Sequence, residues 1–193
     1  MANANGKKLG LTCLFPILEG EHAAQLRKTL RALDRDPFGS PLSKVGIIHM
    51  ARFVIIEDLA YQGLPAKRDT LMSRYLLFLC DFDGTSADAV VAGMTAQIGD
   101  VVDEIWSHCV AYPGRASRDR LTAYFEQCQL ETNLLLVDRP NDELQTILRA
   151  LMCKREFARF VENYQASPGD PKASFQAMWA ALQSQPTPMP GSL

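Results

Sequence analysis

Two aspartates at the end of an apolar run are the residues of this sequence best suited to chemistry. The run is 77–86, LFLCDFDGTS, in which Asp81 and Asp83 are followed by Gly84. Residues i and i+2 of a strand point to the same side, so both carboxylates would leave the strand end together. Gly84 can make a turn, and the N–H groups of a following helix would lie beyond it. Such a pair can hold Mg²⁺ and transfer a phosphoryl group, with Asp81 as nucleophile and Asp83 as general acid/base.

The same stretch resembles the first motif of haloacid dehalogenase-like phosphatases. That resemblance implies a doubly wound parallel sheet, with the nucleophile strand usually first and with a Lys and a further acidic pair on later strands. Here two predicted strands precede the motif and only one clear strand follows it. Asp100 and Asp103 resemble the later acidic motif, but they fall within the very next helix, too soon to return to the same edge of a sheet. The wider sequence therefore argues against the phosphatase.

Two other interpretations of the aspartates remain open. In the first, Asp83 and Gly84 end a strand, and Asp83, Thr85 or Ser86 caps the helix that follows, which would stabilise it by about 1 kcal/mol. In the second, the two carboxylates contact a ligand together with His49. The choice depends on where the neighbouring strand places that histidine.

His49 lies in the strongest strand pattern of the chain, residues 45–57, VGIIHMARFVIIE. A histidine in such an apolar strand can be a core residue with one hydrogen bond. It can also be a haem or metal ligand, or an acid/base group oriented by Asp83. Without a second His or Cys at metal spacing, the pattern is weak for zinc. We take His49 and Asp83 as the candidate catalytic residues.

The distance between these groups follows from the expected pairing of strand 45–57 with strand 74–82. In an antiparallel hairpin with Glu57 near Arg74, paired residue numbers sum to about 131. His49 would then lie opposite Phe82, with Asp81 and Asp83 diagonal to it at about 7–8 Å.

Arg52 is the second polar residue of the strand that holds His49. Strict alternation places it on the opposite face, between Met50 and Val54. An arginine among apolar residues must reach solvent or find an acid, so a salt bridge and the recognition of an anion are both open. Arg52 and Asp81 are therefore the candidate ligand-binding residues.

Composition narrows the class of protein. The chain has 193 residues, 47% of them hydrophobic and 22% charged, with a net charge of -2. No long basic block suggests a nucleic acid or an anionic membrane as partner. No apolar run reaches the roughly 18–20 residues that span a bilayer, and the start, MANANGKKLG, lacks the apolar core of a secretory signal. Five scattered cysteines, an odd number, favour reduced thiols in a cytoplasmic protein.

The remaining elements are predicted from hydrophobic periodicity. Residues 1–165 are expected to form one domain, and residues 166–193 a Pro- and Ser-rich tail with a short helical patch, SFQAMWAAL. Strands are predicted over 9–17, 45–57, 74–82 and 132–138, and helices over 19–35, 85–109, 117–129 and 141–164.

Without the additional helices this order is βαββαβ, the ferredoxin-like α+β arrangement with an antiparallel sheet. The sheet face that its helices leave open is also apolar, and a second copy of the chain is the simplest cover for it. Element order and apolar pattern resemble the dimeric α+β-barrel superfamily, which includes dye-decolourising peroxidases, chlorite dismutase and small monooxygenases. The resemblance spans about residues 9–139 and implies a homodimeric barrel. Related barrels that bind haem place their histidine on a C-terminal helix or loop, which makes His49 a less suitable haem ligand.

Two functions of different classes follow. The first is a protein that binds a small apolar or anionic molecule, with an oxidative, haem- or cofactor-dependent enzyme as one form of it and a site near His49. The second is a non-catalytic homo-oligomeric binding or scaffold protein, in which the apolar sheet face is an interface and the tail contacts a partner through Trp179. The sequence names neither the cofactor nor the ligand.

Overall fold

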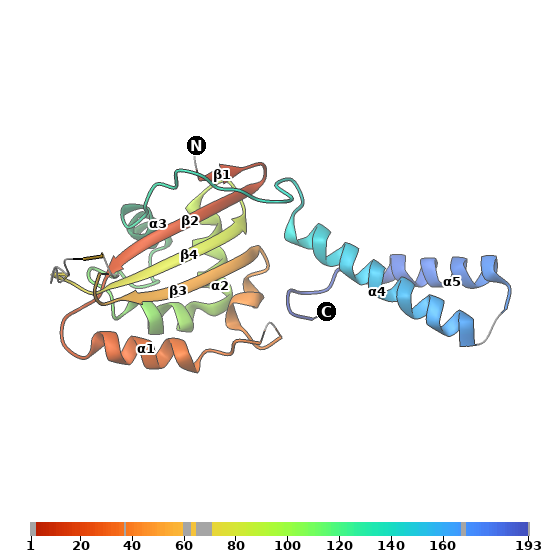
Figure 1. The fold of residues 1–193 in the computed structure, drawn as a ribbon, viewed down its shortest axis with the longest axis horizontal. Helices are drawn as coiled ribbons and strands as arrows, with labels where there is room; N and C mark the ends of the chain where they lie inside the picture. The colour runs from red at the N-terminus through yellow and green to blue at the C-terminus, as the bar shows by residue number, and fades with distance from the viewer. Residues whose placement is uncertain (1–2, 37, 60–62, 65–70, 167–168, 193) are drawn as a thin grey trace.

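The sheet of this protein is antiparallel, and its strands are ordered β1-β2-β4-β3. The computed structural model describes residues 3–36, 38–59, 63–64, 71–166 and 169–192, and within these it has four strands and five α-helices (Figure 1). The strands are β1 (Ala4–Asn5), β2 (Lys8–Pro16), β3 (Ile48–Ile56) and β4 (Tyr75–Asp83). The α+β class and the antiparallel sheet are as predicted, so the parallel sheet that the phosphatase resemblance implies is absent from the described residues.

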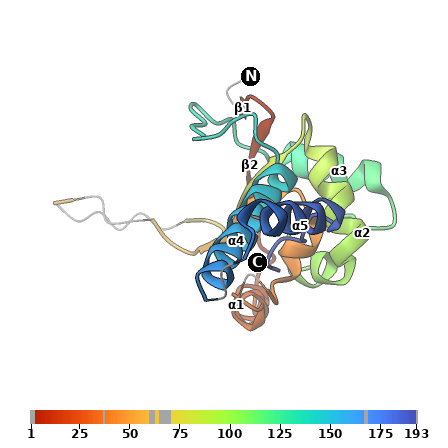
Figure 2. The same ribbon diagram turned by 90° about the vertical axis from the view of Figure 1, so that its right-hand side faces the viewer.

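Three helices cover one face of the sheet: α1 (His22–Ala32), α2 (Ala87–Trp106) and α3 (Arg118–Gln127) (Figure 2). Alternate residues of the strands point toward these helices and are buried, as period-two patterning requires. At the centre of this core, Trp106 lies within 6 Å of the rings of four phenylalanines, which are Phe15, Phe53, Phe78 and Phe125.

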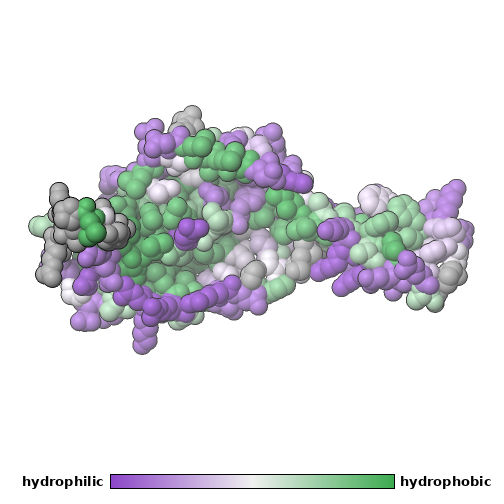
Figure 3. Space-filling model, viewed as in Figure 1, coloured by the Kyte–Doolittle hydropathy of each residue, from purple (hydrophilic) through white to green (hydrophobic). Residues whose placement is uncertain are grey.

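No helix of the described chain covers the opposite face of the sheet, which we call the open face (Figure 2). It is largely apolar, with polar groups set among the apolar ones (Figure 3). Its central apolar side chains come from all three long strands, and they are Leu14, Val54, Ile56, Leu77 and Leu79. Val54 remains 37% exposed, so the chain by itself does not bury this surface.

The predicted register between β3 and β4 is confirmed, with one irregularity. From Met50 opposite Asp81 to Ile56 opposite Tyr75, paired residue numbers sum to 131. Before this stretch the register shifts between Ile48 and Met50, so His49 is an extra residue in a β-bulge. Ile48 therefore takes the place opposite Phe82 that was expected for His49.

The strand predicted over 132–138 is wrong, because the N-terminus takes the edge that it would need. Gly6, with a φ of +60°, begins a two-residue turn that folds β1 back along β2. The 128–130 segment still bonds to β2 at Thr12 and Leu14. Beyond it the chain is held outside β1, where Asn5 donates its side-chain amide to the carbonyl of Leu135. Leu134 and Leu136 are left 78% and 84% exposed.

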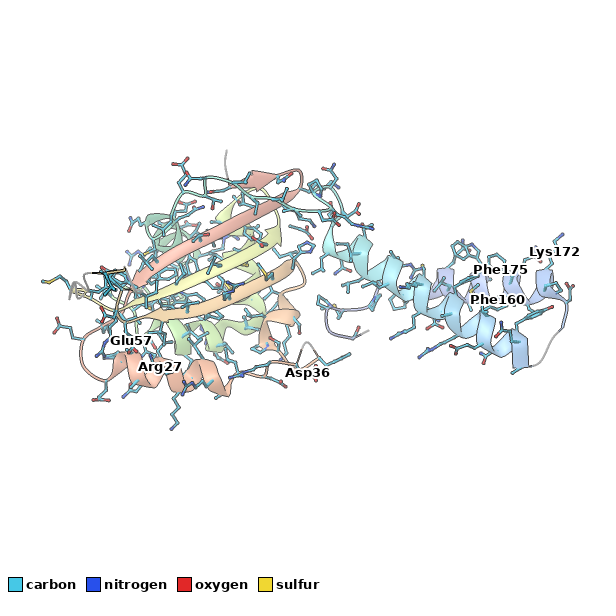
Figure 4. The ribbon with its side chains drawn as sticks, viewed as in Figure 1. Arg27, Asp36, Glu57, Phe160, Lys172 and Phe175 are labelled. Atoms are coloured by element: carbon cyan, nitrogen blue, oxygen red, sulfur yellow. The ribbon has the colours of Figure 1, made fainter. Side chains whose placement is uncertain are left out.

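The last two helices form an arm that projects from the sheet domain (Figure 1). They are α4 (Leu144–Ala166) and α5 (Pro171–Ser184), so the predicted tail patch is part of a longer helix. Phe160 and Phe175 lie between the two helices with ring centroids 6.0 Å apart (Figure 4). Within the described residues, none of the helices is both long enough and apolar enough to cross a membrane.

Candidate functional site

A buried lysine connects the candidate residues at one end of the sheet. Lys8 begins β2 directly opposite Asp83 and is only 3% exposed. Its Nζ lies 2.5 Å from Oδ1 of Asp83 and 2.6 Å from Nε2 of His49, and that Nε2 lies 2.8 Å from the same carboxylate oxygen. The expected closeness of His49 and Asp83 is confirmed. Lys8 was missed, because the strand was predicted to start one residue later.

The same cluster fixes the start of the arm. The N–H of Leu144, the first residue of α4, donates to Oδ2 of Asp83 over 2.7 Å, and Lys8 donates to the carbonyl of Asp142. Asp83 therefore caps α4. The interpretation in which Asp83, Thr85 or Ser86 caps the next helix is not supported, because Asp83 is bonded to α4 and the N-cap of α2, Ser86, makes no side-chain cap. Burial by itself raises the pKa of Asp83, but the hydrogen bonds from Leu144 and Lys8, together with the adjacent His49, outweigh it and lower that pKa below its usual value.

The contacts of Lys8 also assign the proton of His49. An ammonium group has only donors, so the three acceptors around Lys8 are Oδ1 of Asp83, the carbonyl of Asp142 and Nε2 of His49. With Nε2 as an acceptor, the proton of the neutral imidazole is on Nδ1, and the 2.8 Å contact of Nε2 with Asp83 joins two acceptors that share Lys8. Among the described residues Nδ1 has no hydrogen-bond partner. His49 therefore presents an N–H donor to whatever lies beside it.

Beside His49 is a cavity of about 320 Å³, which we call the His49 cavity. It lies where the sheet domain, α4 and the C-terminal segment meet. Its polar lining comes from Arg35, Ser40, Ser43 and His49. Its apolar lining includes Leu42, Ile48, Met50, Leu144 and Leu148, and the C-terminal segment adds Pro190 and Gly191. A volume of this size is near the lower end of the range for small-molecule sites.

Arg52 and Asp81 do not line this cavity. The bulge turns His49 toward Asp83, so Arg52 lies on the same face as His49, and the prediction of opposite faces is wrong. On the open face Arg52 is opposite Leu79, diagonal to Asp81, and within the described chain neither residue has an ion-pair partner. Burial raises the pKa of Asp81, and His49 opposes this effect.

The other reactive side chains offer little for catalysis. All five cysteines are free thiols. Burial raises the pKa of Cys109 to about 12, and it raises those of Cys13 and Cys80 as well, so these thiols are poor nucleophiles. Within the part of the chain that the structure describes, no group of three or more His, Cys, Asp or Glu side chains is arranged to hold a metal ion.

Comparisons with protein-family models, with curated proteins and with solved structures each returned no match. The geometry of the cluster and of the cavity therefore has to carry any assignment of function.

A pair of histidines lies at the other end of the sheet and was not foreseen. Nδ1 of His22, at the start of α1, is 3.1 Å from Nδ1 of His108, just after α2. One of the two nitrogens must donate to the other. The two rings therefore cannot both be in the doubly protonated imidazolium form, because that would place two N–H groups face to face. Burial, followed by the charge of His22, lowers the pKa of His108, while Glu104 opposes them.

This pair predicts a loss of stability in weak acid. His108 has a lower pKa folded than unfolded, so its cost appears as the pH falls from 6.5 toward the folded value and is absent above 6.5. Thermal unfolding of the wild type should therefore lose more stability between pH 7 and pH 5.5 than that of His108→Asn. The difference should be below about 1 kcal/mol because the pair is half-exposed. If stability falls equally with pH in the wild type and in His108→Asn, the two rings do not share a proton.

Proposed function

We propose that the protein binds a small amphipathic anion in the His49 cavity. The observation that carries this proposal is the donor on Nδ1 of His49, which Lys8 fixes and which has no partner in the described chain. Arg35 and Ser40, which carry a guanidinium and a hydroxyl, belong to the same lining. These groups would hold the charged end of the ligand, and the leucine side chains would hold its apolar part.

Binding is better supported than catalysis at His49. A general base needs a free nitrogen lone pair, and the lone pair of Nε2 accepts from the Lys8 ammonium. The same contact speaks against haem, because an axial ligand would have to give up that hydrogen bond. Phosphoryl transfer with Asp83 as the general acid/base is disfavoured as well, since both of its oxygens are already bonded.

Anilinonaphthalenesulfonate, a fluorescent amphipathic anion, provides the test. We expect it to bind the wild type with a dissociation constant of about 10–100 µM. Leu148→Trp should fill the cavity and weaken binding at least about tenfold, and Arg35→Gln, an exposed change that leaves folding intact, should weaken it severalfold.

Leu151→Trp is the matched control, because Leu151 is on the same helix, 48% exposed and outside the cavity lining. It should bind the probe as the wild type does. Equal affinity of the wild type, Leu148→Trp and Arg35→Gln would rule out the cavity as the binding site.

A second function, assembly of a homodimer, is favoured by the open face. The order β2-α1-β3-β4-α2, with β4 between β2 and β3, supports a ferredoxin-like unit, in which the 128–130 segment would be a shortened fourth strand. In this proposal a second copy packs on the open face, as the resemblance to dimeric α+β barrels implies.

Arg52 and Asp81 support this pairing. They are opposite charges on one face, each without an ion-pair partner in the described chain, and a carboxylate with a raised pKa gains from a nearby cation. A twofold axis makes contacts reciprocal, so Arg52 of each copy would meet Asp81 of the other.

A further inference from the structure

The His49 cavity has one wall that does not belong to the sheet domain or to the arm. This wall is the C-terminal segment Gln185–Ser192, which runs back from the end of α5 toward the domain (Figure 1). Pro190 and Gly191 of this segment line the cavity together with His49 and Leu144.

Hydrogen bonds anchor the segment at its start, next to the end of α5. Arg149 of α4 donates from its two terminal nitrogens to the carbonyls of Leu182 and Gln185, over 2.7 and 2.6 Å. This places the fixed end on the arm. Beyond it, within the described residues, no hydrogen bond joins the segment to the sheet domain, and Pro190 and Gly191 beside the cavity are only partly buried.

The residues of the segment favour an extended backbone that ends in a turn. Prolines at positions 186, 188 and 190 alternate with other residues and restrict the backbone to extended conformations. They therefore lower the conformational entropy that is lost when the segment packs against the domain. At its end, Gly191 has a φ of +75°, and the N–H of Ser192 bonds to the carbonyl of Met189, closing a turn beside the cavity. The segment is therefore stiff and anchored at Arg149, and within the described residues only packing holds its far end beside the cavity.

We infer that residues 186–192 are a strap that opens and closes the His49 cavity and so controls how fast a ligand enters and leaves. This inference rests on the proposed binding site and concerns its regulation. A strap changes the rates in both directions because it hinders entry and exit alike.

The test compares the full chain with a chain that ends at Gln185, which keeps the bonds of Arg149. Stopped-flow fluorescence with anilinonaphthalenesulfonate should show the association and dissociation rate constants both rising about tenfold or more in the shortened chain, with the dissociation constant changing less than about threefold. Met189→Ser, at an exposed strap residue outside the lining, is the control and should leave both rates unchanged.

A second measurement needs no ligand. Ser40 lines the cavity and its side chain makes no capping hydrogen bond, so Ser40→Cys introduces a thiol there without loss of a contact. Alkylation of this introduced thiol by iodoacetamide, measured by mass spectrometry relative to Cys153 of α4, should be severalfold faster in the chain that ends at Gln185.

The outcomes separate the two proposals. Equal alkylation of the introduced thiol and unchanged probe rates in both chains would overturn the strap, even if Leu148→Trp confirms binding in the cavity. Faster association with unchanged dissociation and tighter binding would also overturn it, since the segment would then be a competitor that occupies the site. If Leu148→Trp does not weaken probe binding, the binding proposal fails, and alkylation alone decides whether the segment closes the cavity.

Discussion

Replacing Lys8 by methionine is expected to lower the free energy of unfolding by about 3–5 kcal/mol, the usual cost of removing one partner from a buried ion pair. Methionine keeps the apolar stem of the side chain packed, so the loss isolates the charge. Without Lys8, the carboxylate of Asp83 keeps the N–H of Leu144 but loses the cation opposite it. Denaturant unfolding followed by circular dichroism measures the loss.

The neighbouring lysine supplies a control in the same turn. Lys7 pairs with Glu143 at 2.8 Å, but the two side chains are 57% and 51% exposed. Lys7→Met should therefore leave stability unchanged, because exposed ion pairs contribute little. If the two substitutions proved equally mild, Lys8 would not be part of a buried ion pair.

A double-mutant cycle with Asp83→Asn measures the coupling between Lys8 and Asp83. Because each single change leaves a buried group unsatisfied, the double variant should lose less stability than the sum of the two single losses.

The dependence of stability on acid pH tests the same pair in a second way. The lowered pKa of Asp83 means that its contribution is complete above pH 3.8 and disappears as the pH falls through the folded value. Asp83→Asn should show a smaller loss of stability below pH 4 than the wild type.

The part of the site that is set by local patterning could be predicted from the sequence. Apolar residues that alternate along β3 and β4 bury one face of the sheet, and a shift of one residue would expose them. The register, in which paired residue numbers sum to 131, is therefore strongly determined. That register places His49 beside Asp83 along the sheet, but the bulge is what turns its side chain toward Asp83. The bulge at His49 could not be predicted, because one extra residue in an apolar strand leaves no mark in the composition.

The errors arose where distant segments compete for one partner. Residues 132–138 have a strand-like composition, but the turn at Gly6 brings β1 to the edge of β2 first. The pair Asn5-Gly6, a common turn signal, was the available hint. One interpretation made Asp83 a candidate cap of the adjacent helix, but it caps α4, whose first N–H lies 61 residues further along the chain. Local rules identify a residue that can cap a helix, but they do not identify the helix.

Lys8 was missed for a related reason. Two adjacent lysines near the start of a chain are usually solvated, and the sequence offers no local sign that one of them is buried. Its burial becomes understandable only with the tertiary structure, because its partners come from β3, β4 and the residues before α4.

Reversing either charge on the open face should disrupt the proposed dimer. Arg52→Glu or Asp81→Lys places like charges against each other twice across a twofold axis, so each should weaken dimerisation about 10- to 100-fold. Sedimentation equilibrium of the wild type, the two single variants and the double variant would measure this. Lys28→Glu, an exposed change on the helix-covered side, is the control and should leave the dimer mass unaltered.

The double variant Arg52→Glu/Asp81→Lys decides whether the two residues meet across the interface. It keeps one charge of each sign per face with their places exchanged, so the reciprocal contacts are restored and its dissociation constant should return to within about threefold of the wild type. A double variant as weak as the single variants would mean that Arg52 does not face Asp81 of the partner. A wild type that stays monomeric at about 100 µM would refute the dimer, since even weak specific assemblies are populated at that concentration. The open face would then be free for another partner, and the cavity beside His49 would have to function in a single copy of the chain.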